Sequence, residues 1–228
     1  GSEMCIRDSD RVIWATSMVA CGDADGAVTG NTRRFGASLE KIKQVVNVRK
    51  GETMFGLNMV VHKGKTIFIG DTSVHEYPTS EQMAEIAMST ARVVRLFGFD
   101  PKVAFVSHST FGQPLTSRTK HIRDAVEILR EKKVDFEFDG DMQPDVALNS
   151  EYEDLYPFAN IVGKANILIM PGQHSAAISY KLMKTIGDTK VIGPLLIGLG
   201  LPIEIAPLRS STSEIINLAS IAAYSSEV

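Results

Sequence analysis

The chain of 228 residues has little cysteine and no long unbroken apolar run, and both shortages exclude classes of protein. The two cysteines, Cys5 and Cys21, fall outside any CxxC or Cys/His spacing, so neither a zinc site nor a disulfide framework is indicated, and we expect a cytoplasmic location. The most apolar stretch, 191–208, contains Pro194 and Glu204. These interruptions favour a buried strand and a turn over a membrane span.

An excess of positive charge is also lacking. Lysine and arginine number 24 against 27 acidic residues, for a formal net charge of −3. No basic field is therefore available for nucleic acid or an anionic membrane, and we expect neither as a partner. The run Asp23-Ala24-Asp25-Gly26 has part of a calcium-loop pattern, but no acidic residue completes the ligand spacing downstream, so we expect no metal.

Residues 1–10 begin with Gly-Ser and lack the apolar segment of a signal peptide. We interpret them as a non-native leader and leave them out of the fold prediction.

From Thr53 onward, short β-rich runs alternate with segments of helical period. This alternation is typical of an α/β fold with a mainly parallel sheet covered by helices. The pattern predicts a hairpin of strands at 54–61 and 66–70. Further strands are predicted at 102–107, 136–138, 165–170 and 191–199, the last of these being the final strand of the chain. Helices are predicted to start after residue 79 and after residue 211, and to include 122–129, 150–156 and 175–186. The runs Thr79-Ser80-Glu81-Gln82 and Ser211-Thr212-Ser213-Glu214 read as capping boxes that open two of these helices.

Two nucleotide-binding motifs are incomplete. Gly64-Lys65-Thr66 resembles the end of a phosphate loop, but Met59 stands where that motif requires glycine. Gly198-Leu199-Gly200 resembles the start of a dinucleotide fingerprint, but Ile203 takes the third glycine position and Pro202 interrupts the following segment. We therefore expect a hairpin turn at the first and no nicotinamide cofactor at the second.

Several stretches, taken in order, resemble the phosphate acetyl/butyryl transferase (phosphotransacetylase) family. The likeness runs from Trp14 to the C-terminus and is most specific at Gly22-Asp23-Ala24-Asp25-Gly26-Ala27-Val28-Thr29-Gly30. Further stretches that carry it are Asp71–Val74 with Tyr77–Thr79, Ser107–Thr110, Asp139–Gln143, Gly163–Asn166, Tyr180–Leu182 and Ile192–Pro194.

Within the family, the chain is most similar to the copy at the C-terminus of NADP-dependent malic enzymes, through Thr29–Arg34, Gly51–Gly56 and Ser107–Gly112. This resemblance implies that the chain is a fragment. The N-terminal part of the family domain would then lie outside it, as would the malic-enzyme catalytic region with its NADP and divalent metal.

The resemblance also implies a two-lobed α/β/α fold of the isocitrate/isopropylmalate dehydrogenase-like kind, with an acyl-CoA cleft between the lobes. Residues 11–46 and 195–228 would form an incomplete first lobe, and residues 47–194 the second. The loop that starts at Gly22 and the region of Leu208 would meet at the cleft.

Acetyl transfer between CoA and phosphate needs cations for two anions, a base for the thiol and donors for an oxyanion. The resemblance places a Ser-Arg pair and an Asp of active members at positions that here read Pro207, Leu208 and Glu214. Arg209 lies one residue late, and Glu214 also fits a capping box, which we favour over a base. The catalytic candidates Glu214 and Arg209 therefore form a degenerate set that we expect to be inactive.

Binding of acetyl-CoA and phosphate depends less on the lost groups. The resemblance assigns it to glycines, hydroxyl donors, and charged and aromatic side chains, namely Gly22, Asp23, Asp25, Gly26, Gly30, Arg33, Arg34, Ser109, Thr110, Gly112, Tyr180 and Lys181. For each of them a turn, a helix cap, a core position or a solvated surface position stays open as the alternative.

Three functions remain. The first is a regulatory domain that binds acetyl-CoA and acts on the malic-enzyme catalytic domain within a homo-oligomer, with no cofactor in this chain. The second is a working phosphate acetyltransferase that uses Arg209 and Glu214. The third is a structural module through which malic-enzyme subunits associate.

Overall fold

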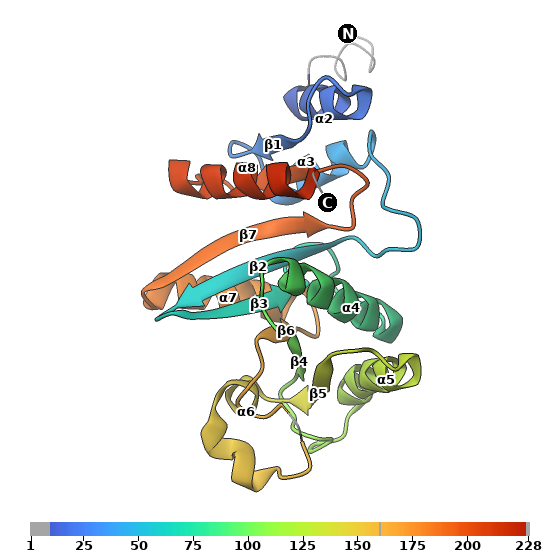
Figure 1. Ribbon diagram of the computed structural model, residues 1–228, viewed down its shortest axis with the longest axis vertical. Helices are drawn as coiled ribbons and strands as arrows, with labels where there is room; N and C mark the ends of the chain where they lie inside the picture. Colours follow the sequence, from blue (N-terminus) through green and yellow to red (C-terminus); the bar gives the residue numbers. More distant parts are fainter. Residues whose placement is uncertain (1–9, 160, 227–228) are drawn as a thin grey trace. The chain divides into compact units, whose positions relative to one another are not determined.

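The computed structural model describes residues 10–159 and 161–226 (Figure 1). Its contacts divide the chain into two compact units, which are described separately: unit 1 is Gly1–Gly56 with Ile192–Val228, and unit 2 is Leu57–Val191. The leader expected at residues 1–10 lies outside the described residues except for Asp10. Among the described residues, no helix has the length and apolar character needed to cross a membrane.

A six-stranded sheet of order β5-β4-β6-β3-β2-β7 has its first five strands mainly in unit 2, whereas most of its last strand belongs to the chain segment of unit 1. Its strands are β2 (Phe55–His62), β3 (Lys65–Gly70), β4 (Lys102–Val106), β5 (Glu137–Met142), β6 (Ile167–Ile169) and β7 (Thr189–Ile197). Strands β3, β6, β4 and β5 pair in parallel, whereas β2 pairs antiparallel with β3. The predicted α/β class with a mainly parallel sheet is therefore confirmed.

The turn of the β2–β3 hairpin explains why Gly64-Lys65-Thr66 is not a phosphate loop. Lys63 and Gly64 both have positive φ, 47° and 80°, and His62 pairs with Lys65 across them. Two central residues of positive φ make the two-residue turn whose twist matches that of paired strands.

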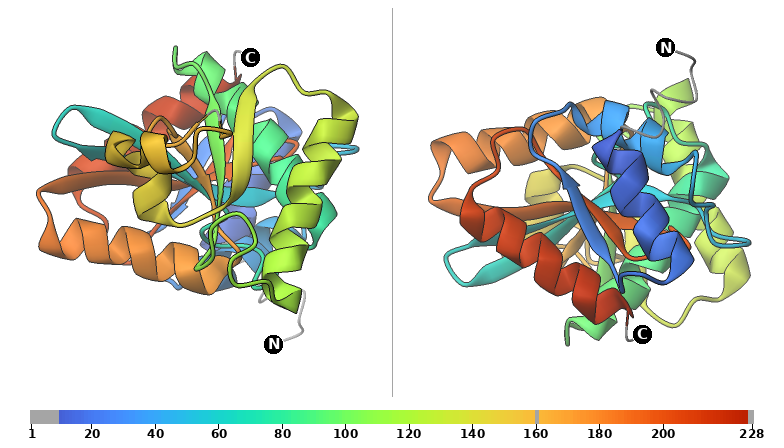
Figure 2. Two further views of the ribbon diagram at one scale, coloured as in Figure 1. Left: turned by 90° about the horizontal axis from the view of Figure 1, so that it is seen from below. Right: turned by 90° about the horizontal axis from the view of Figure 1, so that it is seen from above.

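Helices cover both faces of this sheet. Helices α4 (Ser80–Leu96) and α5 (Ser117–Lys132) pack together on one face, and α6 (Pro144–Leu148) and α7 (Gln173–Ile186) lie on the other (Figure 2). The predicted apolar stripe of α5 is fully buried at Ile122, Ala125, Val126 and Leu129. A 3₁₀ helix, η1 (Ser150–Leu155), occupies the segment where a short helix was expected, whereas α6 was not anticipated.

Unit 1 contains a parallel strand pair, β1 (Ala27–Gly30) and β8 (Ile203–Ala206). Helices α2 (Arg11–Cys21) and α8 (Thr212–Ser226) flank the pair, and α3 (Phe35–Ile42) also packs on it (Figure 2). The prediction that 191–199 is the last strand is wrong, because β8 follows it. Four residues set among glycines and prolines give too short a pattern to distinguish a strand from a turn.

Asp10 begins the described part of unit 1 and has a structural role. Its carboxylate accepts a hydrogen bond from the backbone nitrogen of Val12 at 2.9 Å and so caps α2. It also pairs with Arg33, whose Nη1 lies 2.6 Å from its Oδ2. Asp10 is therefore the N-cap of α2 and does not belong with the excluded leader.

Glu204 is the buried carboxyl group of β8. Its side chain is 4% exposed and accepts one hydrogen bond, from the Leu196 backbone nitrogen at 3.0 Å. Burial raises the pKa of Glu204 to about 8, and the bond from Leu196 opposes that rise only in part. The group is therefore neutral over most of the physiological pH range.

Candidate functional site

The parallel strands of unit 2 place their loops at one edge of the sheet, where open α/β sheets commonly bind ligands. The loops after β3, β4 and β6 and the start of α5 enclose a cavity of about 640 Å³. The lining of the cavity includes Glu76, Tyr77, Pro78, Ser107, His108, His121, Gly172, His174 and Ser175. Its size and its mixture of aromatic and polar groups suit a small organic ligand.

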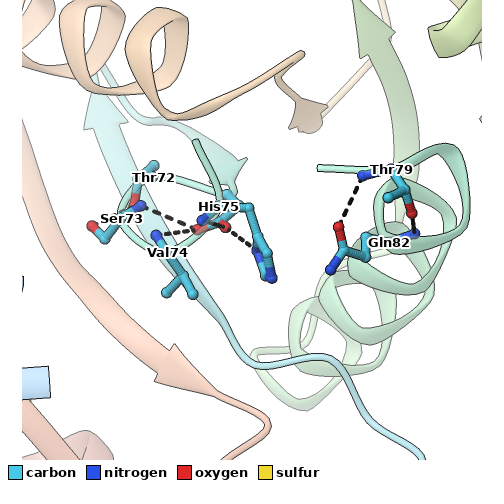
Figure 3. Close-up of polar contacts among 7 residues, drawn as sticks. Thr72, Ser73, Val74, His75, Thr79 and Gln82 are labelled. Atoms are coloured by element: carbon cyan, nitrogen blue, oxygen red, sulfur yellow. Dashed lines mark hydrogen bonds and ion pairs between the residues drawn. The ribbon is translucent and has the colours of Figure 1, made fainter. Parts of the chain in front are cut away.

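Asp71 fixes the loop that follows β3. Its buried carboxylate accepts hydrogen bonds from the backbone nitrogens of Ser73, Val74 and His75, at 3.1, 3.2 and 2.8 Å (Figure 3). The Nδ1 atom of His75 lies 2.6 Å from the same carboxylate. The loop therefore has one defined path into the segment that lines the cavity.

The expected capping box of α4 follows that segment. The Thr79 hydroxyl accepts from the Gln82 backbone nitrogen at 3.2 Å, and the Gln82 side chain accepts from the Thr79 nitrogen at 2.9 Å (Figure 3). The prediction of this helix start is confirmed.

Asp141 plays the corresponding part for the loop after β4. It is fully buried, and it accepts hydrogen bonds from the Ser109 hydroxyl and from the Gly112 backbone nitrogen, the latter at 3.1 Å. The Thr110 hydroxyl accepts from the Gln143 nitrogen at 3.2 Å. All three groups expected to donate to a ligand thus hold their own loop, and their role in binding stays a prediction.

His121 joins the start of α4 to α5 and forms a wall of the cavity. Its Nε2 lies 2.7 Å from the carbonyl oxygen of Pro78, which can only accept, so Nε2 carries the proton. Its Nδ1 lies 2.8 Å from the Ser80 hydroxyl. Both ring nitrogens are therefore occupied within the protein, which makes His121 a structural wall residue.

An aromatic pair stands at the mouth of the cavity. The ring planes of Tyr77 and His174 are within 13° of parallel, and the ring centroids lie 6.5 Å apart. Tyr77 is nevertheless largely open to solvent, with 70% of its surface exposed. The Glu76 carboxylate lies 3.6 Å from His174 Nε2. Gly172 permits this arrangement, because a Cβ there would lie 2.4 Å from the Glu76 carbonyl oxygen.

Tyr180 and Lys181 lie farther along α7 and do not line this cavity. Tyr180 packs against the apolar core of unit 2, and burial raises its pKa. Lys181 is exposed, with its Nζ 5.8 Å from the Tyr180 ring centroid. Packing and solvation account for both side chains here, and their role in binding stays a prediction.

In unit 1 the ends of β1 and β8 bring together several of the expected ligand-binding residues. The Asn31 nitrogen donates to the Ala206 carbonyl at 2.8 Å, and the Arg209 nitrogen donates to the Asn31 carbonyl at 3.2 Å. A cavity of about 450 Å³ opens here, lined in part by Gly30 and Arg33. Within the described part of the chain, Thr29 Oγ1 and Asn31 Oδ1 are buried with no hydrogen-bond partner.

The two arginines after β1 differ in their surroundings. Burial alone would raise the pKa of Asp10, but the hydrogen bond from Arg33 and those from backbone N–H groups lower it below its usual value. Arg33 is thus held in an ion pair, whereas Arg34 is exposed at the start of α3. Arg34 is the freer of the two to meet an anion.

The glycines of the first motif serve backbone packing. Gly22 has φ 80° and ends α2, with open space where a Cβ would lie. A Cβ on Gly26 would lie 3.0 Å from the Pro202 carbonyl oxygen, and one on Gly30 would lie 2.4 Å from that of Ala206. Gly26 and Gly30 therefore let β1 approach the β8 segment, whether or not a ligand also lies nearby. The two acidic residues of the motif, Asp23 and Asp25, are exposed.

Glu214 lies in the capping box predicted for α8. Its Oε2 accepts from the Ser211 backbone nitrogen at 2.7 Å, and the Ser211 hydroxyl accepts from the Glu214 nitrogen at 3.3 Å. The capping box predicted at the start of α8 is therefore confirmed. Leu208, where the resemblance places an arginine, is 51% exposed.

Six residues that shape the unit 2 cavity were given no site role from the sequence, although three of them, Asp71, Tyr77 and Asp141, lie in stretches that carry the family resemblance. The six are Asp71, His75, Asp141, His121, Tyr77 and His174. The available signal was position. Asp71 follows β3 directly, Asp141 lies at the end of β5, and His174 follows the loop after β6. Residues at the carboxyl ends of parallel strands are therefore site candidates by position alone.

Comparisons with known proteins agree with this fold. The family model "Phosphate acetyl/butaryl transferase" matches residues 3–223. An NADP-dependent malic enzyme of Rhizobium meliloti is 44% identical over 95% of this chain, which spans 28% of that protein. The phosphate acetyltransferase of Bacillus subtilis is 29% identical over 94% of the chain and 67% of its own length.

Among solved structures, a phosphotransacetylase from Streptococcus pyogenes superimposes with a TM-score of 0.88 at 29% identity, covering 94% of this chain and 67% of that one. The expected phosphotransacetylase-like fold is confirmed. With a family model that matches nearly all of its residues, the chain belongs to the phosphate acetyl/butaryl transferase family.

Proposed function

We propose that this chain binds acetyl-CoA as a regulatory ligand without transferring the acetyl group, as the C-terminal domain of an NADP-dependent malic enzyme. The observation that carries the proposal is the loss of the catalytic side chains from the segment between β8 and α8. The resemblance places the catalytic Ser-Arg pair at Pro207 and Leu208, which offer neither a hydroxyl nor a charge, and Leu208 is 51% exposed.

The remaining catalytic candidates do not replace that pair. The Glu214 carboxylate is engaged with the backbone nitrogen and the hydroxyl of Ser211, at 2.7 and 2.9 Å. A base must instead reach the proton that it removes. Arg209 is exposed, its backbone has the left-handed φ of 60°, and its nitrogen donates to the Asn31 carbonyl oxygen.

Features that suit binding are retained. Each unit has a cavity at the carboxyl ends of parallel strands, of about 640 Å³ in unit 2 and about 450 Å³ in unit 1. The unpartnered Thr29 and Asn31 oxygens in unit 1 would gain hydrogen bonds from a polar ligand. A domain that keeps such cavities but lacks transfer groups fits a sensor better than an enzyme.

The malic-enzyme part of the proposal rests on relatives. The chain spans 28% of the Rhizobium meliloti enzyme, so malate, NADP and a divalent metal would belong to the rest of a longer protein. Acetyl-CoA would then act through a homo-oligomer on the catalytic domain. Such regulation requires that acetyl-CoA bind two states of the protein with different affinities.

The alternative is an active phosphate acetyltransferase. It is favoured by the match over 67% of the Bacillus subtilis enzyme and by the position of Arg209, whose nitrogen bonds Asn31 at the end of β1. A guanidinium one residue late would have to serve the phosphate from a new direction.

A calorimetric titration and a transfer assay separate these proposals. We expect saturable binding of acetyl-CoA and no acetyl phosphate formed from acetyl-CoA and phosphate. Turnover comparable to that of a stand-alone phosphate acetyltransferase, measured in parallel, would establish the alternative. The absence of both binding and turnover would leave the structural module as the remaining function.

A further inference from the structure

We infer that the mouth of the unit 2 cavity is an adenine-binding platform, on which a base stacks against Tyr77 and His174 while Glu76 accepts a hydrogen bond from its exocyclic amino group. The inference rests on the proposed function, since acetyl-CoA is an adenine nucleotide. It goes further by stating which part of the ligand this cavity takes.

Two largely exposed rings at this cavity are stacked on each other. Tyr77 is 70% exposed and the His174 side chain is 73% exposed, yet their rings are within 13° of parallel. Exposed aromatic residues held flat at the entrance of a cavity are the usual means of stacking a base. The rings are held in place because the buried Asp71 fixes the preceding loop and Gly172 brings the two segments together.

A carboxyl group lies beside the two rings. The Glu76 carboxylate lies 3.6 Å from His174 Nε2 and is 65% exposed. A carboxylate repels a phosphate but accepts a hydrogen bond from an amino group. The mouth therefore suits the base of the nucleotide better than its phosphates, and it suits adenine, which carries an amino group, better than hypoxanthine, which carries a carbonyl there.

The cavity also has room for a ligand larger than the base. The cavity behind the rings measures about 640 Å³, and hydroxyl groups of Ser107 and Ser175 line it. This volume lies within the range of small-molecule sites. A nucleotide whose base stays at the mouth thus has polar partners for the rest of the molecule.

The test is calorimetric titration of the chain with acetyl-CoA, ADP and IDP. The variant Tyr77→Leu keeps an apolar side chain but removes the ring, Tyr77→Phe keeps the ring, and Phe158→Leu removes a comparably exposed ring, 68% exposed, elsewhere in unit 2. We expect Tyr77→Leu to lower the affinity of the chain for ADP and for acetyl-CoA by roughly ten-fold. Tyr77→Phe and Phe158→Leu should bind as the parent does.

A second variant tests the amino-group contact. The parent chain should prefer ADP to IDP, and Glu76→Gln should narrow this preference, because a glutamine amide can also donate to the carbonyl of hypoxanthine. Equal affinity of the parent for ADP and IDP would overturn the part assigned to Glu76.

The outcomes separate this inference from the proposed function. Acetyl-CoA binding that is unchanged by Tyr77→Leu would overturn the inference and leave the proposed function standing. If ADP bound in a manner that depends on Tyr77 and acetyl-CoA did not bind at all, the inference would stand and the proposed function would be overturned. If neither ligand bound the folded chain, both would be wrong.

Discussion

The carboxylate of Glu214 and the backbone nitrogen of Ser211 are joined by a hydrogen bond of 2.7 Å, and the Ser211 hydroxyl returns a bond to the Glu214 nitrogen. This reciprocal pair caps the start of α8, with Glu214 in the first turn of the helix. We expect Glu214→Ala to lower the free energy of unfolding by about 1 kcal/mol. Glu214→Gln should be nearly neutral, because an amide oxygen can serve the same cap.

Denaturant unfolding of the two variants checks this expectation. Acetyl-CoA binding by both folded variants should equal that of the parent. A loss of binding in Glu214→Gln without a loss of stability would instead place the carboxylate at the ligand.

A second prediction concerns the segment between β8 and α8. The double variant Pro207→Ser with Leu208→Arg supplies a hydroxyl, a backbone donor and a positive charge. If the rest of the site is intact, it should form acetyl phosphate where the parent does not. Leu208→Lys with Pro207→Ser is the control for charge without the guanidinium fork, and it should gain less. A folded double variant without any gain would show that the site has diverged beyond these two positions.

Glu204 gives a pH-dependent prediction. Its pKa is about 8 in the folded protein against an ordinary value of 4.5. Between these values the folded chain keeps a proton that the unfolded chain releases, so the free energy of unfolding falls as pH rises through this window. Glu204→Gln removes the ionisable group. At pH 8 to 9 its free energy of unfolding should exceed that of the parent by a few kcal/mol, which is the order of magnitude that corresponds to the pKa shift.

The same comparison at pH 5 should show a much smaller difference. The variant keeps an oxygen that can accept from the Leu196 nitrogen, which lies 3.0 Å from the carboxylate. Substitution of the exposed Glu131 by glutamine is the control and should not alter the pH profile. A stability difference between Glu204→Gln and the parent that did not depend on pH would contradict the raised pKa.

Alanine substitutions at Gly22 and Gly30 test how closely β1 approaches β8. Both have positive φ, 80° and 96°, but only Gly30 would place a Cβ against backbone, 2.4 Å from the Ala206 oxygen. Gly22→Ala should cost about 1 kcal/mol for its conformation alone. Gly30→Ala should cost more, because β1 and β8 must also separate. Equal losses in thermal unfolding would show that β1 and β8 do not approach each other this closely.

The sequence predicted the regular elements of unit 2 well, for physical reasons that particular residues illustrate. The hairpin turn at Lys63 and Gly64 and the capping box at Thr79 are local, so their hydrogen bonds depend on residues a few positions apart. The same holds for the capping box at Ser211 in unit 1. Strand β8 was missed, because its pairing with β1 joins residues far apart in the chain.

The site was harder to predict than the fold. Ser109 and Gly112 were expected to meet a ligand, yet they bind Asp141, which lies some thirty positions away. Likewise, Tyr77 and His174 meet only because Gly172 admits the loop after β3. Such contacts depend on tertiary placement, which no local pattern contains.

The central claim is that the chain binds acetyl-CoA and does not transfer its acetyl group, and calorimetric titration with acetyl-CoA in phosphate buffer tests it most directly. A sensor gives heats that saturate with one ligand per chain, and no free CoA thiol appears by the end. We predict that result. Heats that continue in proportion to added acetyl-CoA, with release of the thiol, would contradict the claim, as would the absence of any heat of binding to the folded chain.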